Sequence, residues 1–336
     1  MTDVKATIRE YMERRNRYWV SGDLESLAEF WATGGRGNNW EWLREGWERR
    51  LRLANARACQ LLRAHSHVRL TRLDLKAEGN EAEVELQETI HWVYRDGIDY
   101  AVEGRMVRHW QCWNKSEQGV WQITHAQESD ETRPCPRPGP DGGSGGMDRQ
   151  VDAPRPALRA LLRRFTRPTC NEYDRVKALR YAELWWNRPN PQYVYFRADD
   201  CTNFASQCLY SAGVPMHDTG DRASGWWYRF NDSGADTWSL SWSIANALHL
   251  YLVGQVQATE LASARELKIG DLIFYDWNGQ GRYGHSTVVV DFDQQGDPLV
   301  NAHTDASYHR HYLYLDSRAW SPQTRYAFVH LPQRVC

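Results

Sequence analysis

The sequence lacks the features that mark nucleic-acid-binding and membrane proteins. Its 336 residues carry 41 Lys and Arg against 43 Asp and Glu, and this formal net charge of −2 gives no field to attract nucleic acid. No apolar run reaches the roughly 18 residues of a membrane span. The start, Met1–Lys5, lacks the apolar core of a signal peptide. We therefore expect no nucleic-acid partner, no membrane span and a cytoplasmic location.

Metal-binding patterns are also missing. His303, His309 and His311 lie close together in sequence, but without a nearby pair of cysteines or a His-Glu-x-x-His pattern. We expect no metal and no cofactor. The seven cysteines are odd in number, and Cys135 falls in a stretch rich in proline and glycine, where oxidation would expose it to stray pairing. This usage favours a reducing compartment.

Proline and glycine divide the chain into two parts. The run from 134 to 146 alternates proline with polar residues and then becomes almost pure glycine. Such a segment buries little apolar area and behaves as a linker. We place an N-terminal domain at 1–133, a linker at 134–150 and a second domain at 151–336, with an entry helix around Ala157 to Phe165.

The N-terminal half changes its periodicity part-way along. Apolar residues have helical spacing in three segments, Thr2–Val20, Leu24–Trp31 and Trp40–Ala58. After Ser66 they recur at every second residue, as in strands. Three helices before an antiparallel meander resemble the cystatin-like or nuclear-transport-factor-like α+β roll, mainly through the helix-Gly22-Asp23-helix opening. Rolls of this kind form pockets and dimers, so we expect dimerisation or partner binding here, and not a second active site.

The most informative stretch is Asp200–Gln207, where an extended aromatic segment, Tyr193–Phe196, precedes a predicted helix. Cys201 would lie in the first helical turn, beside unpaired backbone N–H groups and the positive end of the helix dipole. That setting lowers the pKa of a thiol, and the same N–H groups could hold an oxyanion. The alternative is that Cys201 is a small buried hydrophobe.

A histidine at the head of a β-branched strand is the natural base for such a thiol. His285 begins the run that ends at Val290, and a turn near 294–298 leads into a further strand. The turn places residues 303 to 305 opposite His285. One of three residues on the next strand could fix the tautomer of the His285 ring: His303 is favoured, then Asp305, then Asn301.

Four segments carry a resemblance over residues 171 to 331. They are Tyr173–Arg175 with Tyr181 and Ala182, Asp200–Cys208, Gly270–Ile273 through His285, and Ala302–Asp305. This part resembles the putative amidase domain family of bacteria, a branch of the papain-like cysteine peptidases related to the CHAP and NlpC-type cell-wall enzymes. The resemblance implies an α+β fold of helices and an antiparallel sheet. It also implies that Cys201 is the nucleophile, His285 the base and His303 the third member.

Aromatic residues could contribute to a substrate site. The chain has 17 tryptophans, and Trp226 and Trp227 lie in a loop-like stretch between predicted helices. They could wall a peptide cleft, although core packing is the simpler interpretation. Tyr195 lies six residues before Cys201, where a papain-like enzyme tends to place an oxyanion donor; packing is equally plausible for it.

Together these features predict a cysteine-dependent amide hydrolase that works through a thioacyl-enzyme. The resemblance implies peptidoglycan or a derived peptide as the substrate, which conflicts with a cytoplasmic location. Two alternatives share the sequence evidence. One is an acyltransferase or transpeptidase with the same chemistry, and the other is a non-catalytic module that binds wall material or peptides.

Overall fold

The computed structural model describes residues 3–32, 39–57, 59–76, 79–129, 170–196, 199–231 and 236–336. The predicted linker at 134–150 and the entry helix around Ala157 to Phe165 lie outside the described residues. In the part of the chain that is described, no helix is both long and apolar enough to cross a membrane.

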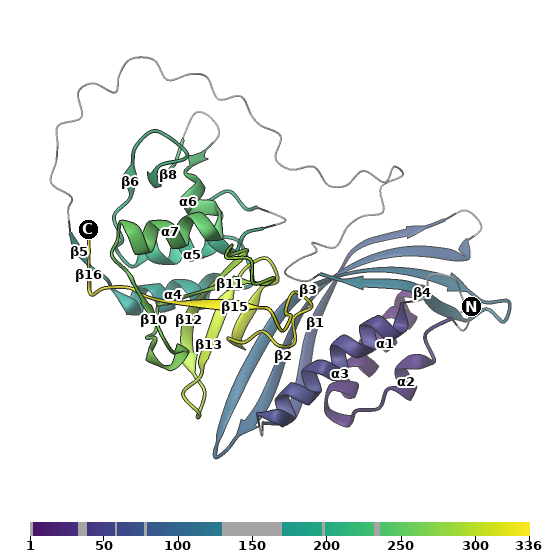
Figure 1. Ribbon diagram of the computed structural model, residues 1–336. Helices are drawn as coiled ribbons and strands as arrows, with labels where there is room; N and C mark the ends of the chain where they lie inside the picture. The colour runs from purple at the N-terminus through teal and green to yellow at the C-terminus, as the bar shows by residue number, and fades with distance from the viewer. Residues whose placement is uncertain are drawn as a thin grey trace.

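The N-terminal half has the predicted three helices followed by an antiparallel meander (Figure 1). Its elements are α1 (Val4–Ser21), α2 (Glu25–Ala28), α3 (Trp40–Ala56), β1 (Gln60–Leu75), β2 (Glu81–Asp96), β3 (Asp99–Lys115) and β4 (Trp121–Glu128). The Asp3 carboxylate caps α1 by accepting from the Lys5 N–H, and Gly22 ends the helix with a φ of 72°. Local sequence signals therefore set both ends of α1.

Alternation along the strands builds the N-terminal core. Every second residue of β2 from Ala82 to Tyr94 is buried, as expected for a strand with one face against helices. The aromatic residues Tyr11, Tyr18, Trp47 and Trp92 fill the space between the helices and this face.

In the C-terminal half, helices pack on an antiparallel sheet, which gives the predicted α+β class. Its helices are α4 (Arg175–Trp185), α5 (Cys201–Ser211), α6 (Leu240–Ser243), α7 (Ala245–Gly254) and the 3-10 turn η3 (Ala264–Glu266). The main strands are β10 (Thr259–Leu261), β11 (Leu272–Asp276), β12 (His285–Phe292), β13 (Pro298–Ala302), β14 (Ser307–His311) and β15 (Arg325–His330). Short pairs are formed by β5 (Asn171–Glu172) with β16 (Arg334–Val335), β6 (His217–Asp218) with β7 (Gly225–Trp226), and β8 (Tyr228–Arg229) with β9 (Thr237–Trp238).

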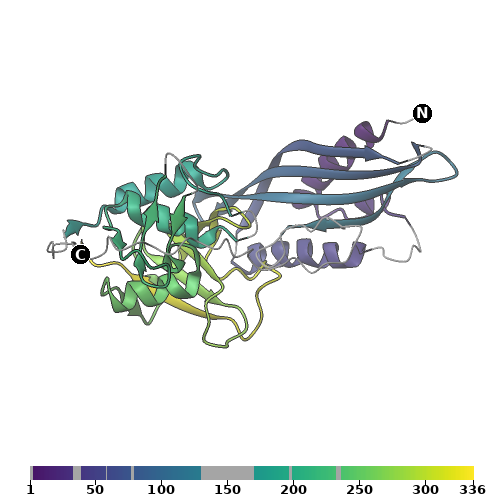
Figure 2. The same ribbon diagram turned by 90° about the horizontal axis from the view of Figure 1, so that it is seen from above.

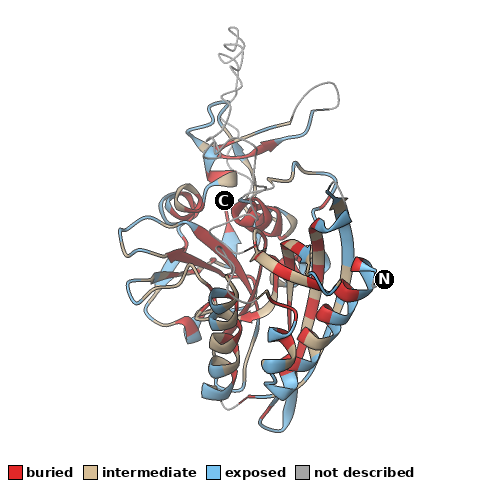
Figure 3. Cartoon of the chain, turned by 90° about the vertical axis from the view of Figure 1, so that its right-hand side faces the viewer, coloured by how far each residue is buried: buried red, intermediate tan, exposed pale blue. Residues whose placement is uncertain are grey.

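The central strands of this half are buried along nearly their whole length (Figure 3). The predicted hairpin is present, because β12 pairs antiparallel with β13 and Val288 lies opposite Asn301. Tyr193–Phe196, expected to be extended, forms no strand. Its aromatic residues instead pack on neighbouring aromatic side chains, for example Phe196 on Trp238 of β9 at 4.8 Å between ring centroids.

One sheet runs through both halves of the molecule. Its order is β1-β2-β3-β14-β13-β12-β11-β15-β10, with β4 also paired to β3. The junction is antiparallel pairing of β3 with β14, which places Arg105 opposite Ser307 and Gly104 opposite Tyr308. Figure 2 shows the long N-terminal strands reaching the C-terminal half. Nothing local in the sequence predicts this pairing.

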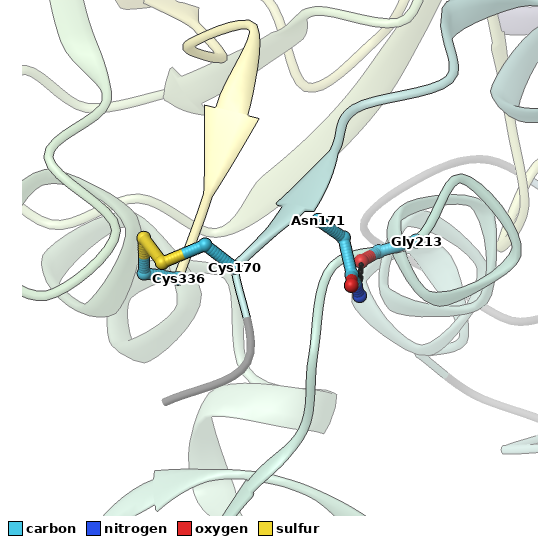
Figure 4. Close-up of a disulfide and its surroundings, with 4 residues drawn as sticks. All are labelled: Cys170, Asn171, Gly213 and Cys336. Atoms are coloured by element: carbon cyan, nitrogen blue, oxygen red, sulfur yellow. Dashed lines mark hydrogen bonds between the residues drawn. A yellow bond between two sulfur atoms is a disulfide. The ribbon is translucent and has the colours of Figure 1, made fainter. Parts of the chain in front are cut away.

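A disulfide joins Cys170 to Cys336 beside the β5–β16 pair (Figure 4). Asn171 next to it donates through its side-chain amide to the Gly213 carbonyl at 2.8 Å. The disulfide runs against the reducing compartment inferred from the odd cysteine count, because disulfides persist in oxidising surroundings.

Candidate active site

Cys201 is the first residue of α5 and is only 1% exposed. The same helix sends Phe204 and Cys208 into the main core of the C-terminal half, so the helix start is fixed against the sheet. The prediction of a helix beginning at this cysteine is confirmed.

The thiol lies against the first peptide of β12. Its sulfur is 3.4 Å from Asp199 Oδ1 and 3.7 Å from the Thr202 hydroxyl, and the backbone N–H of Ser286 also donates toward it. Ser286 directly follows His285. The fold therefore places the predicted nucleophile, Cys201, against the residue that directly follows the predicted base, His285.

The pKa of the thiol is raised, where the helix start was expected to lower it. Burial raises the pKa of Cys201 to about 12, and the negative charge of Asp199 adds to the rise. Hydrogen bonds from Thr202 and Ser286 offset only part of this shift. The thiol is therefore protonated at neutral pH in this conformation. Burial also raises the pKa of Asp199 itself.

The N–H groups at the start of α5 are occupied by a side chain. The Thr304 hydroxyl accepts from the Asp200 N–H at 3.0 Å and from the Cys201 N–H at 3.1 Å. The N–H expected to hold an oxyanion is thus engaged. Thr304 adopts a φ of +79°, an unfavourable conformation for a β-branched residue.

His285 begins β12 and is 2% exposed. Its ring contacts Tyr275, Trp277 and Tyr314, with the Trp277 ring stacked at 5.8 Å between centroids. The hydroxyl of Ser286 is 3.3 Å from that of Thr202 in α5. Because side chains alternate along a strand, the His285 ring points to the other face. The expected Cys201–His285 ion pair is not among the contacts of Cys201 in the described part of the chain.

His303 does not orient His285 as predicted. Its Nδ1 lies 2.6 Å from Asp200 Oδ2, and its Nε2 lies 2.7 Å from the Trp185 carbonyl oxygen. Both ring nitrogens are therefore engaged elsewhere. The β12–β13 register, continued from Val288 opposite Asn301, would place Thr304 opposite His285. The predicted interval of 303 to 305 contains that position.

The two alternatives for the third position also have other partners. Asp305 forms ion pairs with Arg105 and, at 3.7 Å, with Arg310. Asn301 donates to the Ala182 carbonyl at 3.3 Å and accepts from the His309 N–H at 2.8 Å. These contacts hold β13 and the turn after it in place, and none of them is to the His285 ring.

Asp200 is a residue of the candidate site that the sequence reasoning did not single out. Besides His303, its carboxylate accepts from the Phe196 N–H at 2.9 Å and from the Asn203 amide at 2.8 Å, and the residue is 1% exposed. An acidic residue directly before a helix is a usable signal, since carboxylates are favoured there. Its pairing with His303, more than 100 residues away, has no local signature.

Trp226 and Trp227 are buried, in agreement with core packing, the simpler of the two interpretations. They are 0% and 2% exposed. The Trp226 indole donates to the Ser206 hydroxyl at 3.0 Å, and the Trp227 indole to the Ser224 carbonyl at 3.1 Å. Both are core residues.

Tyr195 contacts the N-terminal half. Its hydroxyl accepts from Arg108 of β3 at 2.9 Å, so the N-terminal half contacts the segment before the nucleophile.

A cation could be considered at only one place in the described ranges. Asp293, Asp297 and His311 hold ligand atoms within 4.8 Å of one another. The two carboxylates already pair with Arg57 and Arg265, which supply the positive charge that a metal would bring.

Residues 172–329 match the family model described as a putative amidase domain. The chain is similar to the uncharacterized protein YhbB of Bacillus subtilis, with 45% identity over 163 residues, which is 48% of this chain and 50% of YhbB. It is also similar to YjcM of the same organism, with 27% identity over 35% of this chain and 28% of YjcM. The chain thus spans half or less of these curated relatives.

Solved structures were matched as well. A nuclear transport factor 2-like protein of Salmonella enterica covers 42% of this chain and 97% of its own, at 18% identity and a TM-score of 0.26. A related protein with a cystatin-like fold from Novosphingobium aromaticivorans covers 38% and 90%, at 16% identity and a TM-score of 0.25.

Proposed function

We propose that the chain hydrolyses an amide bond through Cys201, with His285 as the general base, in a papain-like mechanism. One observation carries this proposal. The sulfur at the first position of α5 receives the N–H of Ser286, the residue after His285. The match of residues 172–329 to an amidase model supports the reaction class.

Activation requires the thiol and the imidazole to meet. The His285 ring packs on Tyr275, Trp277 and Tyr314, on the other face of β12, so it must leave these contacts and the start of β12 must shift before the ring reaches the Cys201 sulfur. Catalytic hydrogen bonds commonly tighten only when substrate is bound. The conformation described above is therefore a resting state of the site.

The reaction then follows the chemistry of a cysteine hydrolase. His285 accepts the thiol proton, and the thiolate attacks the carbonyl carbon of the substrate amide. The tetrahedral intermediate collapses to a thioacyl-enzyme as His285 protonates the leaving amine. His285 next takes a proton from water, which attacks the thioester and regenerates the thiol.

The oxyanion needs two donors. The Cys201 N–H serves once the Thr304 hydroxyl moves away, and the Tyr195 hydroxyl is the second candidate. A phenol oxygen that accepts from a guanidinium, as Tyr195 does from Arg108, becomes a better donor through its own O–H. His303 and Asp200 keep the start of α5 fixed throughout.

The substrate proposed from the family resemblance is peptidoglycan or a peptide derived from it. A transferase would pass the same thioacyl group to an amine in place of water. A binding module without turnover is favoured by one observation, the buried thiol with its raised pKa.

The test uses soluble peptidoglycan fragments and mass spectrometry of the products. Cys201→Ala should lower hydrolysis by at least about a thousandfold, because the nucleophile is lost. Cys208→Ala, in the same helix and equally buried, is the matched control and should keep most of the activity. New amide products that appear only with added amine would indicate a transferase. Equal activity of the Cys201→Ala and Cys208→Ala variants would exclude Cys201 as the nucleophile.

A further inference from the structure

One face of the N-terminal sheet carries arginines that bind no acid. Helices α1 and α3 cover the opposite face (Figure 1), against which every second residue of β2 from Ala82 to Tyr94 is buried. The alternate residues of β1, β2 and β3 point the other way. Four arginines on this outer side form what we call the basic face: Arg63 and Arg69 of β1, Arg95 of β2 and Arg108 of β3.

The strand register brings these four side chains together. Gln87 lies opposite Arg69 in one direction and opposite Arg108 in the other, so these two arginines are about 10 Å apart across the sheet. From Arg95 to the level of Gln87 the face is about 25 Å long. Three of the four arginines are exposed, and Arg108 is half-buried. Their charges repel one another unless an anion lies among them.

The carboxylates of the same sheet face lie at its far end and are already bound. They are Asp74, Glu81, Glu83 and Glu85. Arg72 pairs with Asp74 and, at 3.4 Å, with Glu85, and Lys76 pairs with Glu83 at 2.9 Å and with Glu81 at 4.0 Å.

Acids of the neighbouring C-terminal half do not neutralise the basic face either. Glu183 and Asp291 pair with His309, and Asp199 accepts from the Cys201 thiol at 3.4 Å. Within the described ranges, no carboxylate lies within ion-pair distance of any of the four arginines. The basic face therefore keeps its positive charge.

The basic face leads to the candidate active site. Arg108 Nη2 donates to the Tyr195 hydroxyl at 2.9 Å, and the Tyr195 ring meets that of His303 edge to face at 6.5 Å between centroids. Trp186, at the end of α4, lies beside the face, with its ring 5.7 Å from that of His91. A chain that lies on the basic face and continues past Arg108 reaches the segment before Cys201.

We infer that the basic face binds carboxylates of the substrate, so that the preferred substrate is an extended chain with acidic groups several residues from the amide bond that is cleaved. The inference rests on the proposed function of Cys201. Each guanidinium presents a planar pair of N–H donors that matches a carboxylate. The length of the face suits about eight residues of extended chain. A second copy of this chain suits the face less well, because its own acids there are already bound to Arg72 and Lys76.

The test measures binding to the full-length Cys201→Ala variant by calorimetry. One probe is soluble peptidoglycan fragments with free carboxylates, and the other is the same fragments with their carboxylates converted to N-methylamides. The free carboxylates should give at least about tenfold tighter binding. The double variant Arg63→Gln, Arg69→Gln should lose most of this difference. The matched control, Arg9→Gln with Arg17→Gln, removes the same charge from exposed residues of α1 and should keep it.

Turnover gives a second readout in the chain with Cys201 intact. The substitutions of Arg63 and Arg69 should raise KM for the free-carboxylate fragments about tenfold and leave kcat within about twofold, because these side chains touch no reacting atom. A fall in kcat at unchanged KM would overturn the inference.

The outcomes separate this inference from the proposed function. Equal binding of the two probes, or equal losses in the Arg63/Arg69 and Arg9/Arg17 variants, would overturn the inference even if hydrolysis depends on Cys201. Hydrolysis at the wild-type rate in Cys201→Ala would contradict the proposed function, whereas carboxylate-dependent binding that is lost with Arg63 and Arg69 would still support the basic face. Tighter binding of a 20-nucleotide single-stranded DNA or of phosphatidylglycerol vesicles than of the fragments would overturn it in favour of a nucleic acid or an anionic membrane.

Discussion

His303 Nδ1 lies 2.6 Å from Asp200 Oδ2, and both side chains are at most 5% exposed. The pair connects the turn after β13 to the residue before Cys201. Thr304, next in that turn, accepts from the N–H groups of Asp200, just before α5, and of Cys201, and Asp305 is bound by Arg105 of the N-terminal half. Three consecutive residues therefore fix the position of the candidate nucleophile, and the last of them does so with help from the other half of the chain.

Removing His303 should be strongly destabilising. His303→Ala leaves the Asp200 carboxylate buried without its partner, and breaking a buried pair in this way costs about 3–5 kcal/mol. Urea unfolding followed by fluorescence measures the loss. His217→Ala, at an exposed histidine, is the control and should change the unfolding free energy by less than about 0.5 kcal/mol. Equal effects of the two substitutions would mean that the pair contributes nothing specific.

Substitutions of Thr304 should separate its hydroxyl from its backbone conformation. Thr304→Val removes the acceptor of two N–H groups and should cost about 1–2 kcal/mol. Thr304→Ser keeps the hydroxyl and loses the β-branch that is unfavourable at a φ of +79°, so it should be neutral or slightly stabilising. Hydrogen exchange of the Cys201 N–H should accelerate in Thr304→Val only. Acceleration in both variants would show that packing of the Thr304 methyl group, and not the hydroxyl, protects this N–H.

The Cys170–Cys336 disulfide should be found in protein prepared without reductant. Peptide mapping should recover the two cysteines as one linked pair. Because the link spans 166 residues, Cys336→Ser should lower the unfolding free energy by about 2–5 kcal/mol. Recovery of both cysteines as thiols, with no stability change in the variant, would contradict this bond.

The reactivity of Cys201 should depend steeply on pH in the absence of substrate. Only the thiolate reacts with iodoacetamide, and burial raises the pKa of this thiol to about 12. The thiolate fraction, and with it the rate, should therefore rise about tenfold per pH unit from about pH 7 to 10, without a plateau. In urea the rate should level off above the ordinary thiol pKa of about 8.5. A plateau near neutral pH that disappears in His285→Ala would instead mean that the ion pair is already formed at rest.

The sequence predicts much of this framework because local signals set it. The helix that starts at Cys201, the β12–β13 hairpin and the helices-then-meander order of the N-terminal half follow from periodicity and turn residues. The resemblance to amidase domains located residues 171 to 331, and the family model matches 172–329.

Long-range contacts are the part that the sequence does not predict. The thiol pKa was expected to fall because a helix start is visible locally, whereas the burial that raises it depends on tertiary packing. The partner of His303, the pairing of β3 with β14 and the disulfide join segments far apart in the chain. Trp226 appeared to lie in a loop, but its neighbours include α5, and it is buried with its indole hydrogen-bonded to Ser206.

The central claim is that Cys201 forms a thioacyl-enzyme. The most direct measurement is mass spectrometry of protein quenched in acid during turnover of soluble peptidoglycan fragments, followed by peptide mapping. We expect an acyl adduct on the peptide that contains Cys201, at a level that falls sharply in His285→Ala because the thiol is no longer deprotonated. Hydrolysis that continues without any adduct on Cys201, and at an unchanged rate in Cys201→Ala, would contradict the account.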